Sequence, residues 1–465
     1  MIPMTLAHIA EVTGGSIAGT GDLDPAEIVI DGPVVTDSRE AEPGSLYIAR
    51  VGEHADGHQY VGGAAAKGAV AALVTMPVDG LPHVLVTDVQ DAFVALARHL
   101  VDSRGPSLNV IGITGSSGKT STKDLLGAVL AQDGETIAPQ GSYNSEVGVP
   151  LTVCRITPTT AHLVVEMGAR GAGHVRYLTE IAPPRIGAVL NVGHAHVGEF
   201  GSLDAVARAK SELVEALPAD GVAVLNADDP RVAAMAPLTS ARVVFVGESP
   251  RAQIRAEQVR TDDRGRASFD LVTPVGTAPV TLALVGRHHV GNALTVAAIA
   301  LESGLALDQI ATALAATGPV SRWRMEVSER ADGVTVVNDA YNANPDSMRA
   351  ALRAVADMAV PGRRWAVLGA MLEMGEESEA LHEQVGREAA NLGFNEVLAV
   401  GKIAAPIAAG AMAAADSTHA EVVADTDGAW DVLSDRLRPG DVVLFKSSRD
   451  AGLRWLAERV VEVTK

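Results

Sequence analysis

The pattern of hydrophobic and polar positions divides the chain into three segments, which predicts three domains. From residue 1 to 106, short apolar runs are separated by turns rich in Gly, Pro and Asp, a pattern typical of a small α/β unit. Residues 107–320 and 321–465 instead hold longer apolar runs separated by helical stretches. The polar stretch 103–107 is the expected linker after the first domain.

The two later segments are expected to be α/β domains with mainly parallel sheets. Strands are expected at 108–113, 162–165, 186–190, 222–225, 365–368, 397–400 and 441–446. Because these runs are apolar throughout, the strands must be covered by helices on both faces, as in parallel sheets. No G-x-G-x-x-G sequence follows a strand in the third segment, so a Rossmann-like, doubly wound domain is predicted there without a dinucleotide cofactor.

Composition narrows the class of protein further. The chain of 465 residues is 47% hydrophobic and 20% charged, which argues against a disordered protein and against a membrane bundle. One cysteine, Cys154, excludes a disulfide framework. The net charge of −20 disfavours nucleic acid as a partner. With neither a signal-peptide pattern nor a long apolar stretch in the sequence, we expect a cytoplasmic protein that does not insert into membranes.

A glycine-rich loop after the first strand of the second segment is the most informative motif. It comprises Gly115, Ser116, Ser117, Gly118, Lys119 and Thr120. Glycines let backbone N–H groups converge on phosphate oxygens, the lysine neutralises them, and the threonine hydroxyl binds Mg²⁺. The general phosphate-loop pattern has a further glycine where Ile113 stands. The motif predicts a site for ATP or GTP.

Three other polar residues lie where they could share that site. Glu166 ends the apolar run 162–165, and a carboxylate at the end of a parallel strand can hold a metal, although a surface glutamate is as plausible from this feature alone. His196 follows the strand 186–190 in a His-x-His sequence, for which a polar loop is the simpler interpretation. Lys210 lies within a helical pattern and, by itself, reads as a solvated lysine.

Taken in order, these motifs resemble the Mur ligase family, whose phosphate loop T-G-x-x-G-K-[ST] matches residues 114–120. The other matching stretches are 143–150 (YNSEVGVP), 166–168 (EMG), His196, 210–212 (KSE), 286–292 (GRHHVGN), 324–326 (RME) and 446–449 (KSSR). This resemblance covers nearly the whole chain. It departs from the usual pattern at Ser211, Ala370 and Ser447.

The stretch 338–348 (NDAYNANPDSM) is similar to the version found in the family member that adds D-alanyl-D-alanine, and 368–375 with His382 points the same way. The resemblance implies an ATP-dependent amide-forming ligase with an acyl-phosphate intermediate. Its substrates would be UDP-MurNAc-tripeptide and D-Ala-D-Ala, in peptidoglycan precursor synthesis. Domain 1–106 would bind the UDP substrate, 107–320 ATP, and 321–465 the dipeptide; we expect a monomer.

The resemblance also implies roles for individual residues. Thr120 and Glu166 would hold one Mg²⁺, and His196 with a carbamylated Lys210 a second. Lys119, Lys210, His196 and Asn144 would act in catalysis. Residues 115–120 would bind ATP together with His288, Asn292, Arg324 and Asp339. Ser38 and Arg39 would bind the UDP substrate, and the dipeptide would contact Tyr341, Asn342, Asn344, Lys446, Ser448 and Arg449.

Two alternatives stay open. One is another ligase of the superfamily, either a sister enzyme adding a single amino acid or a folylpolyglutamate synthase. The other is a phosphate-loop switch that hydrolyses nucleotide and joins nothing. The sequence does not determine the third peptide residue of the substrate.

Overall fold

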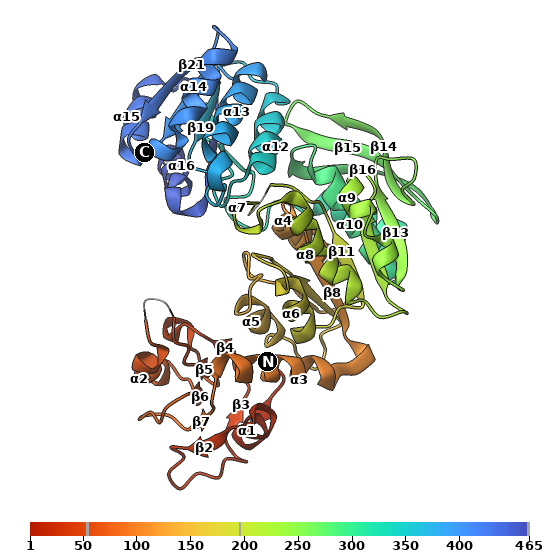
Figure 1. Ribbon diagram of the computed structural model, residues 1–465, viewed down its shortest axis with the longest axis vertical. Coiled ribbons are helices and arrows are strands. Elements are labelled where there is room, and N and C mark those ends of the chain that lie inside the picture. The colour runs from red at the N-terminus through yellow and green to blue at the C-terminus, as the bar shows by residue number, and fades with distance from the viewer. Residues whose placement is uncertain (53–54, 195–196, 463–465) are drawn as a thin grey trace.

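The computed structural model describes residues 1–465 except 53–54, 195–196 and 463–465, and the chain forms three lobes, each built around its own sheet (Figure 1). The N-terminal and C-terminal lobes lie at opposite ends of the central one. In the described part of the chain, no helix is both long and apolar enough to cross a membrane.

The N-terminal lobe carries a five-stranded sheet of order β2-β7-β6-β5-β4 and a small β1–β3 pair. Its strands are β1 (Met4–Thr5), β2 (Ser16–Ala18), β3 (Val29–Ile30), β4 (Val34–Val35), β5 (Leu46–Ile48), β6 (Ala71–Val74) and β7 (His83–Leu85), and its helices are α1 (Leu6–Thr13), α2 (Val61–Ala66) and α3 (Val89–Arg104). The expected linker at 103–107 is the end of α3 followed by a 3₁₀ turn, Gly105–Ser107.

The central lobe has a nine-stranded sheet of order β16-β15-β14-β13-β12-β11-β8-β10-β9. The strands are β8 (Asn109–Thr114), β9 (Thr136–Ile137), β10 (His162–Glu166), β11 (Ile186–Val189), β12 (Val222–Asn226), β13 (Arg242–Gly247), β14 (Ile254–Thr261), β15 (Arg266–Thr273) and β16 (Gly276–Val285). Strands β8 to β14 pair in parallel, which confirms the predicted parallel sheet. Strands β15 and β16 extend it in antiparallel fashion, and buried residues alternate with partly exposed ones along β15, as in a sheet with one face in water.

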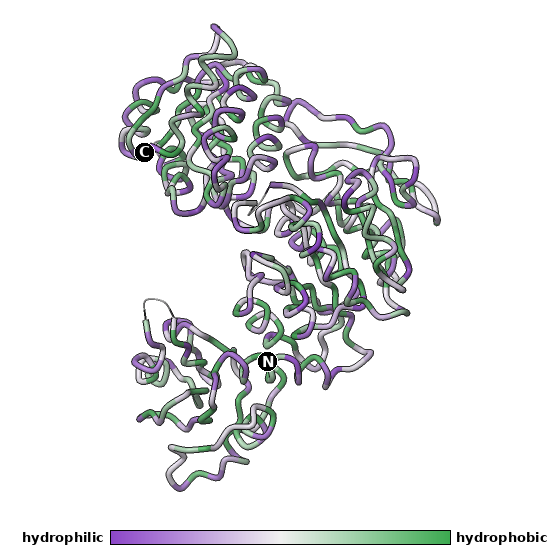
Figure 2. The backbone as a smooth tube through the Cα atoms, in the orientation of Figure 1, coloured by the Kyte–Doolittle hydropathy of each residue, from purple (hydrophilic) through white to green (hydrophobic). Residues whose placement is uncertain are grey.

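Helices cover both faces of the central sheet. They are α4 (Lys119–Leu130), α5 (Gly148–Val153), α6 (His174–Ile181), α7 (Val197–Phe200), α8 (Leu203–Glu215), α9 (Pro230–Ala233), α10 (His289–Glu302) and α11 (Leu307–Ala316). One core, which is continuous with that of the N-terminal lobe, includes Val165 and Leu213, and the core on the other face includes Ile111 and Leu126. Hydrophobic colouring accordingly concentrates along the inner strands (Figure 2).

The C-terminal lobe has the predicted doubly wound form, with sheet order β17-β18-β22-β19-β20-β21. Its strands are β17 (Glu326–Glu329), β18 (Thr335–Asn338), β19 (Arg364–Leu368), β20 (Glu396–Val400), β21 (His419–Val423) and β22 (Val442–Lys446), and its helices are α12 (Pro345–Ala356), α13 (Ser378–Asn391), α14 (Ala405–Ala414), α15 (Thr426–Arg436) and α16 (Leu453–Val461). Only β17 pairs antiparallel within the described sheet.

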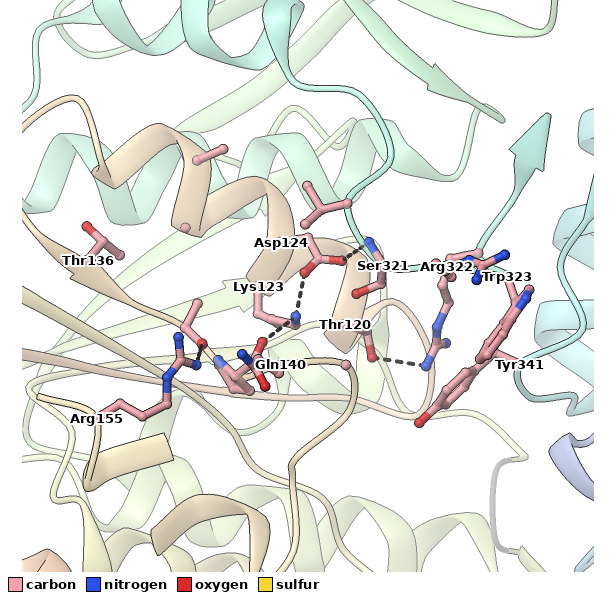
Figure 3. A pocket seen from close by; sticks show the side chains of 17 residues that line it. Thr120, Lys123, Asp124, Thr136, Gln140, Arg155, Ser321, Arg322, Trp323 and Tyr341 are labelled. Carbon is pink, nitrogen blue, oxygen red and sulfur yellow. Dashed lines mark hydrogen bonds and ion pairs between the residues drawn. The ribbon is translucent and has the colours of Figure 1, made fainter. Parts of the chain in front are cut away.

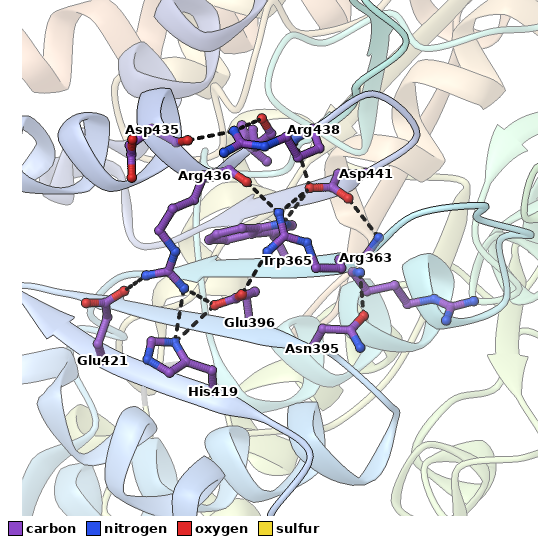
Figure 4. A network of polar contacts seen from close by, with 12 residues as sticks. Arg363, Trp365, Asn395, Glu396, His419, Glu421, Asp435, Arg436, Arg438 and Asp441 are labelled. Atoms are coloured by element: carbon purple, nitrogen blue, oxygen red, sulfur yellow. Dashed lines mark hydrogen bonds and ion pairs between the residues drawn. The ribbon is translucent and has the colours of Figure 1, made fainter.

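A polar network closes the amino ends of the C-terminal strands (Figure 4). Buried Asp441 accepts hydrogen bonds from Trp365 Nε1 and Arg363 Nη2, both at 3.0 Å. Glu396 pairs with Arg363 at 3.0 Å and with Arg436. Since the charges at this end are paired with one another, the carboxyl ends of the parallel strands remain as the place for a ligand site.

Candidate functional site

The glycine-rich loop connects β8 to α4, as the motif predicts. Gly118 has a φ of 82°, in the left-handed region, and a Cβ there would lie 2.8 Å from Asn292 Oδ1. Lys119 Nζ donates a hydrogen bond to Gly115 O at 2.6 Å, so the lysine side chain folds back onto the backbone of the loop. Glycine at 118 is therefore required both by backbone conformation and by the close approach of Asn292.

A second loop, which follows β11, supports the glycine-rich loop. The backbone N–H of Ser117 donates to Asn191 Oδ1 at 2.9 Å, and that of Ser116 donates to Asn191 O at 3.1 Å. Gly193 N donates to Ser116 Oγ at 2.8 Å. Asn191 was not among the predicted site residues, although its position directly after a parallel strand was a usable signal.

Glu166, at the end of β10, is buried and gathers oxygen and amide groups from two segments. Its Oε2 accepts from Thr120 Oγ1 at 3.0 Å, and its Oε1 accepts from Asn144 Nδ2 at 2.7 Å and from Ser142 Oγ at 3.1 Å. A hydroxyl beside a carboxylate is an oxygen donor set that suits Mg²⁺, whose other ligands are phosphate oxygens and water. No cluster of three or more His, Cys, Asp or Glu side chains placed to hold a metal occurs within the described residues.

Lys210, on α8, is buried at 4% exposure rather than solvated, which corrects the simple interpretation of that lysine. Burial holds the pKa of Lys210 well below its usual value, and the charge of Lys119 lowers it further. Burial also lowers the pKa of Lys119, against the opposing effect of Glu166. His196, predicted to join Lys210, lies outside the described residues.

The C-terminal lobe reaches this site through Arg324. Its Nη2 donates to Thr120 Oγ1 at 3.1 Å, and its guanidinium lies 4.3 Å from the centre of the Tyr341 ring. The neighbours of Arg324, Trp323 and Met325, have φ values of 60° and 50°. Non-glycine residues held in that region carry strain, which typically occurs at functional positions. A hollow of about 650 Å³ is lined by residues of both lobes, among them Thr120, Arg322 and Tyr341 (Figure 3).

Asp339 and the buried Lys446 form an ion pair at the ends of β18 and β22. Lys446 Nζ lies 2.5 Å from Asp339 Oδ2 and donates to Asn342 O at 3.1 Å. Asp339 Oδ1 accepts from Met325 N at 3.1 Å, which fixes the backbone next to Arg324. Burial lowers the pKa of Lys446, and the charge of Asp339 partly restores it.

Two histidines begin α10. Burial lowers the pKa of His289 well below its usual value, and the neighbouring His288 adds to this effect. Asn292 Nδ2 lies 3.3 Å from His289 Nδ1. His288 is exposed along the cavity, yet the surrounding protein also lowers its pKa. The buried His289 imidazole is therefore neutral near pH 7 and can offer a hydrogen bond without charge.

Most predicted residues line one cavity of about 210 Å³ between the central and C-terminal lobes. These are Ser116, Ser117, Gly118, Lys119, Thr120, Asn144, Glu166, His288, Asn292, Arg324, Asp339, Tyr341, Asn342, Asn344 and Lys446. A neighbouring cavity of about 590 Å³ is lined by Lys119, Asn144, Lys210, Tyr341, Asn342 and Arg449, among others. Lys119 and Asn144 thus line both cavities.

Among the described residues, four predicted ones do not line these two cavities: Gly115, Ser38, Arg39 and Ser448. Ser38 and Arg39 lie in the N-terminal lobe, where Arg39 is exposed and its hydrogen bonds lower the pKa of Asp37 to about 2. Ser448 is buried and its Oγ accepts from Leu372 N at 3.0 Å. Ser142, Ser347 and His289 line the 210 Å³ cavity without having been predicted.

Comparison with known proteins agrees with this geometry. The descriptions "Mur ligase middle domain" and "Mur ligase, glutamate ligase domain" match residues 113–300 and 323–449. The UDP-N-acetylmuramoyl-tripeptide–D-alanyl-D-alanine ligase of Mycobacterium tuberculosis is 45% identical over 501 residues, covering 99% of this chain and 98% of that protein. The ligase of the same name from Escherichia coli is 38% identical, covering 86% and 87%.

Two crystal structures are also similar. MurF from Acinetobacter baumannii superposes with a TM-score of 0.87 at 30% identity and covers 99% of both chains. A MurF ligase from Thermotoga maritima in complex with ADP superposes with a TM-score of 0.79 at 27% identity, covering 93% of this chain and 99% of that one.

Proposed function

The chain belongs to the Mur ligase family, and we propose that it joins D-alanyl-D-alanine to UDP-N-acetylmuramoyl-tripeptide with ATP. The observation that carries this proposal is the 45% identity to a ligase of that name across 99% of the chain. The geometry of the site supports the proposal, because the glycine-rich loop and Glu166 line one cavity together with the basic residues Arg324 and Lys446 of the C-terminal lobe.

The chemistry explains why cations gather there. A carboxylate is a poor electrophile, so we propose that the γ-phosphoryl group is first transferred to it, giving an acyl phosphate that the dipeptide amine then attacks. Bringing a carboxylate to a phosphate opposes like charges, at about 1 kcal/mol per pair at 4 Å in water and several times more in protein. Lys119 and Arg324 would offset this repulsion, in a reaction where positioning and charge stabilisation supply most of the catalysis.

Thr120 and Glu166 would hold Mg²⁺, which when bound would neutralise phosphate charge. Asn144, which donates to Glu166, would also orient the phosphate or the substrate carboxylate. His288, Asn292 and Asp339 would bind the base and ribose. Lys119 would then stand between nucleotide and acyl substrate; its place in the lining of both cavities supports this assignment.

We also propose that Lys210 is carbamylated and holds a second Mg²⁺ with His196. The lowered pKa of Lys210 supports this, because only a neutral amine reacts with CO₂ and because a carbamate, unlike an ammonium, attracts a cation. Incubation with ¹³C-bicarbonate should give a carbamate ¹³C resonance in the wild-type chain and none in K210M. An identical resonance in both proteins, or none in either, would contradict the assignment.

The remaining assignments divide the substrates among the lobes. Residues 1–106 would bind the UDP moiety through Ser38 and Arg39, 107–320 would bind ATP, and 321–465 would bind the dipeptide. Tyr341, Asn342, Asn344, Lys446, Ser448 and Arg449 would form the dipeptide side. We propose that the chain works as a cytoplasmic monomer; an assembly larger than 47.9 kDa in light scattering would contradict the monomer.

Turnover with one component withheld at a time tests the proposal. Phosphate release should require ATP, Mg²⁺, UDP-MurNAc-tripeptide and D-Ala-D-Ala together, and the UDP-linked pentapeptide should form in equal amount. Release without either acceptor would instead indicate a phosphate-loop switch, and turnover with a single amino acid in place of the dipeptide would indicate a sister ligase.

A further inference from the structure

The start of α12 in the C-terminal lobe contacts the loop that follows β11 in the central lobe. Asp346 Oδ2 accepts a hydrogen bond from His194 N at 2.8 Å and lies 3.3 Å from His194 Nδ1. A second contact nearby joins Gly198 N to Glu373 O at 3.1 Å. Two segments of the C-terminal lobe therefore hold one segment of the central lobe.

The loop that receives Asp346 is bonded directly to the phosphate loop. Ser116 Oγ accepts from Gly193 N at 2.8 Å and donates to Gly193 O at 3.1 Å. Asn191 fixes the adjacent Ser117 through both its carboxamide oxygen and its carboxamide nitrogen. A shift of Asp346 would consequently be transmitted to the phosphate loop through one pair of hydrogen bonds.

The fit at this contact depends on the absence of a side chain at residue 193. A Cβ on Gly193 would lie 2.2 Å from Asp346 Oδ2, far inside van der Waals contact. The carboxylate therefore rests on the bare backbone of the loop, which limits how the two lobes can be placed relative to each other.

Asp346 is itself held in place and is not needed to cap its helix. Asn344 supplies the cap, because its Oδ1 accepts from Ser347 N at 2.9 Å. Asp346 Oδ1 lies 3.4 Å from Arg349 Nη1, and Arg349 pairs with Glu388 on α13 at 2.9 Å. The Asp346 carboxylate is thus held by Arg349 within the C-terminal lobe and contacts the backbone of the central lobe.

We propose that Asp346 is a positioning residue. Its contact with the loop after β11 would hold the C-terminal lobe in a fixed position relative to the phosphate loop, so that Arg324 and the acceptor amine are correctly aligned with the transferred phosphate. The inference rests on the proposed ligase function but concerns a residue that lines neither the 210 Å³ cavity nor the 590 Å³ cavity. Misplacing reacting groups by about 1 Å can cost on the order of 100-fold in rate, which sets the scale of the expected effect.

Kinetics of D346A and D346N separate positioning from mere stability. In D346A, kcat for ligation should fall about 30-fold while the melting temperature stays within error, because only the register of the lobes changes. D346N keeps an oxygen acceptor for His194 N, so its kcat should stay within about threefold of wild type. D416A, which removes an exposed carboxylate of the same lobe, is the matched control and should behave as wild type.

A distance measurement tests the docking without relying on ligation. Cys154 is buried, so a thiol-reactive spin label will attach to cysteines introduced at exposed positions instead. Labels on D220C and D416C then report the distance between the central and C-terminal lobes. With ADP bound, the distance distribution should broaden in D346A and in G193A but not in D346N. Failure of the wild type to ligate would reject the proposed function alone. An unchanged distance distribution in D346A, or equal loss of kcat in D346A and D346N, would overturn the role of Asp346.

Discussion

Replacing Lys119 by methionine is expected to lower kcat for amide formation by about 10³-fold, the range seen when a preorganised charge stabiliser is removed from phosphoryl or acyl transfer. Lys119 lines both cavities of the site, and its Nζ is already turned inward by a 2.6 Å hydrogen bond to Gly115 O. Methionine keeps an unbranched side chain that is one atom shorter, but it removes the charge that would meet the phosphate. Coupled detection of ADP release at saturating substrates measures the loss.

Arginine at the same position is the informative comparison. K119R keeps the charge but replaces a compact ammonium with a planar guanidinium, which cannot occupy the small space under the turn in the same way. We expect K119R to recover no more than about a tenth of wild-type kcat, because both charge and placement matter. A K119M enzyme within tenfold of wild type would show that Lys119 is not the main stabiliser of the transferred phosphoryl group.

The largest expected loss of stability comes from Gly386→Ala, at the crossing of α13 and α14. A Cβ on Gly386 would lie 1.8 Å from Ile407 O, and one on Gly410 would lie 2.0 Å from Glu383 O. Both obstacles are backbone atoms of the facing helix, so no side-chain rotation relieves the conflict. Overpacking typically costs about 1–3 kcal/mol, and this site should reach the upper end because two helices must separate.

Gly62→Ala in α2 is the matched control, since a Cβ there meets nothing within 4 Å. It should leave stability unchanged or raise it by up to about 1 kcal/mol, because alanine favours a helix over glycine. Thermal melting compares the two, and hydrogen exchange in α13 and α14 localises the effect. Equal melting temperatures for G386A and G62A would show that the helices move apart at little cost.

The local sequence was sufficient to predict two parts of the site, the glycine-rich loop and Glu166. The phosphate loop between a buried strand and a helix, and Glu166 at the end of the next parallel strand, follow from patterns within a few residues. Lys210 was different: its helical pattern alone indicates a solvated face, and only the packing of α8 beside the phosphate loop buries it.

Contacts between distant segments could not be predicted. Asp346 and Gly193 are separated by about 150 residues, and nothing in either local sequence indicates that a carboxylate will rest on that glycine. The antiparallel strands β15 and β16 were not predicted either. Buried residues alternate with more exposed ones along both strands, so they lack the continuous apolar runs from which the other strands were predicted. The proposed roles of Ser38 and Arg39 in binding the UDP moiety likewise stay predictions.

The central claim is that ATP activates the tripeptide carboxylate before the amine attacks, and oxygen labelling tests it most directly. UDP-MurNAc-tripeptide carrying ¹⁸O in its terminal carboxylate should yield phosphate with one ¹⁸O atom per turnover, because the carboxylate oxygen that bridges to phosphorus leaves with the phosphate. Mass spectrometry of the released phosphate reads this result. Phosphate without label, formed while the pentapeptide accumulates, would contradict the acyl-phosphate route and the arrangement of Lys119, Arg324 and the two cavities built upon it.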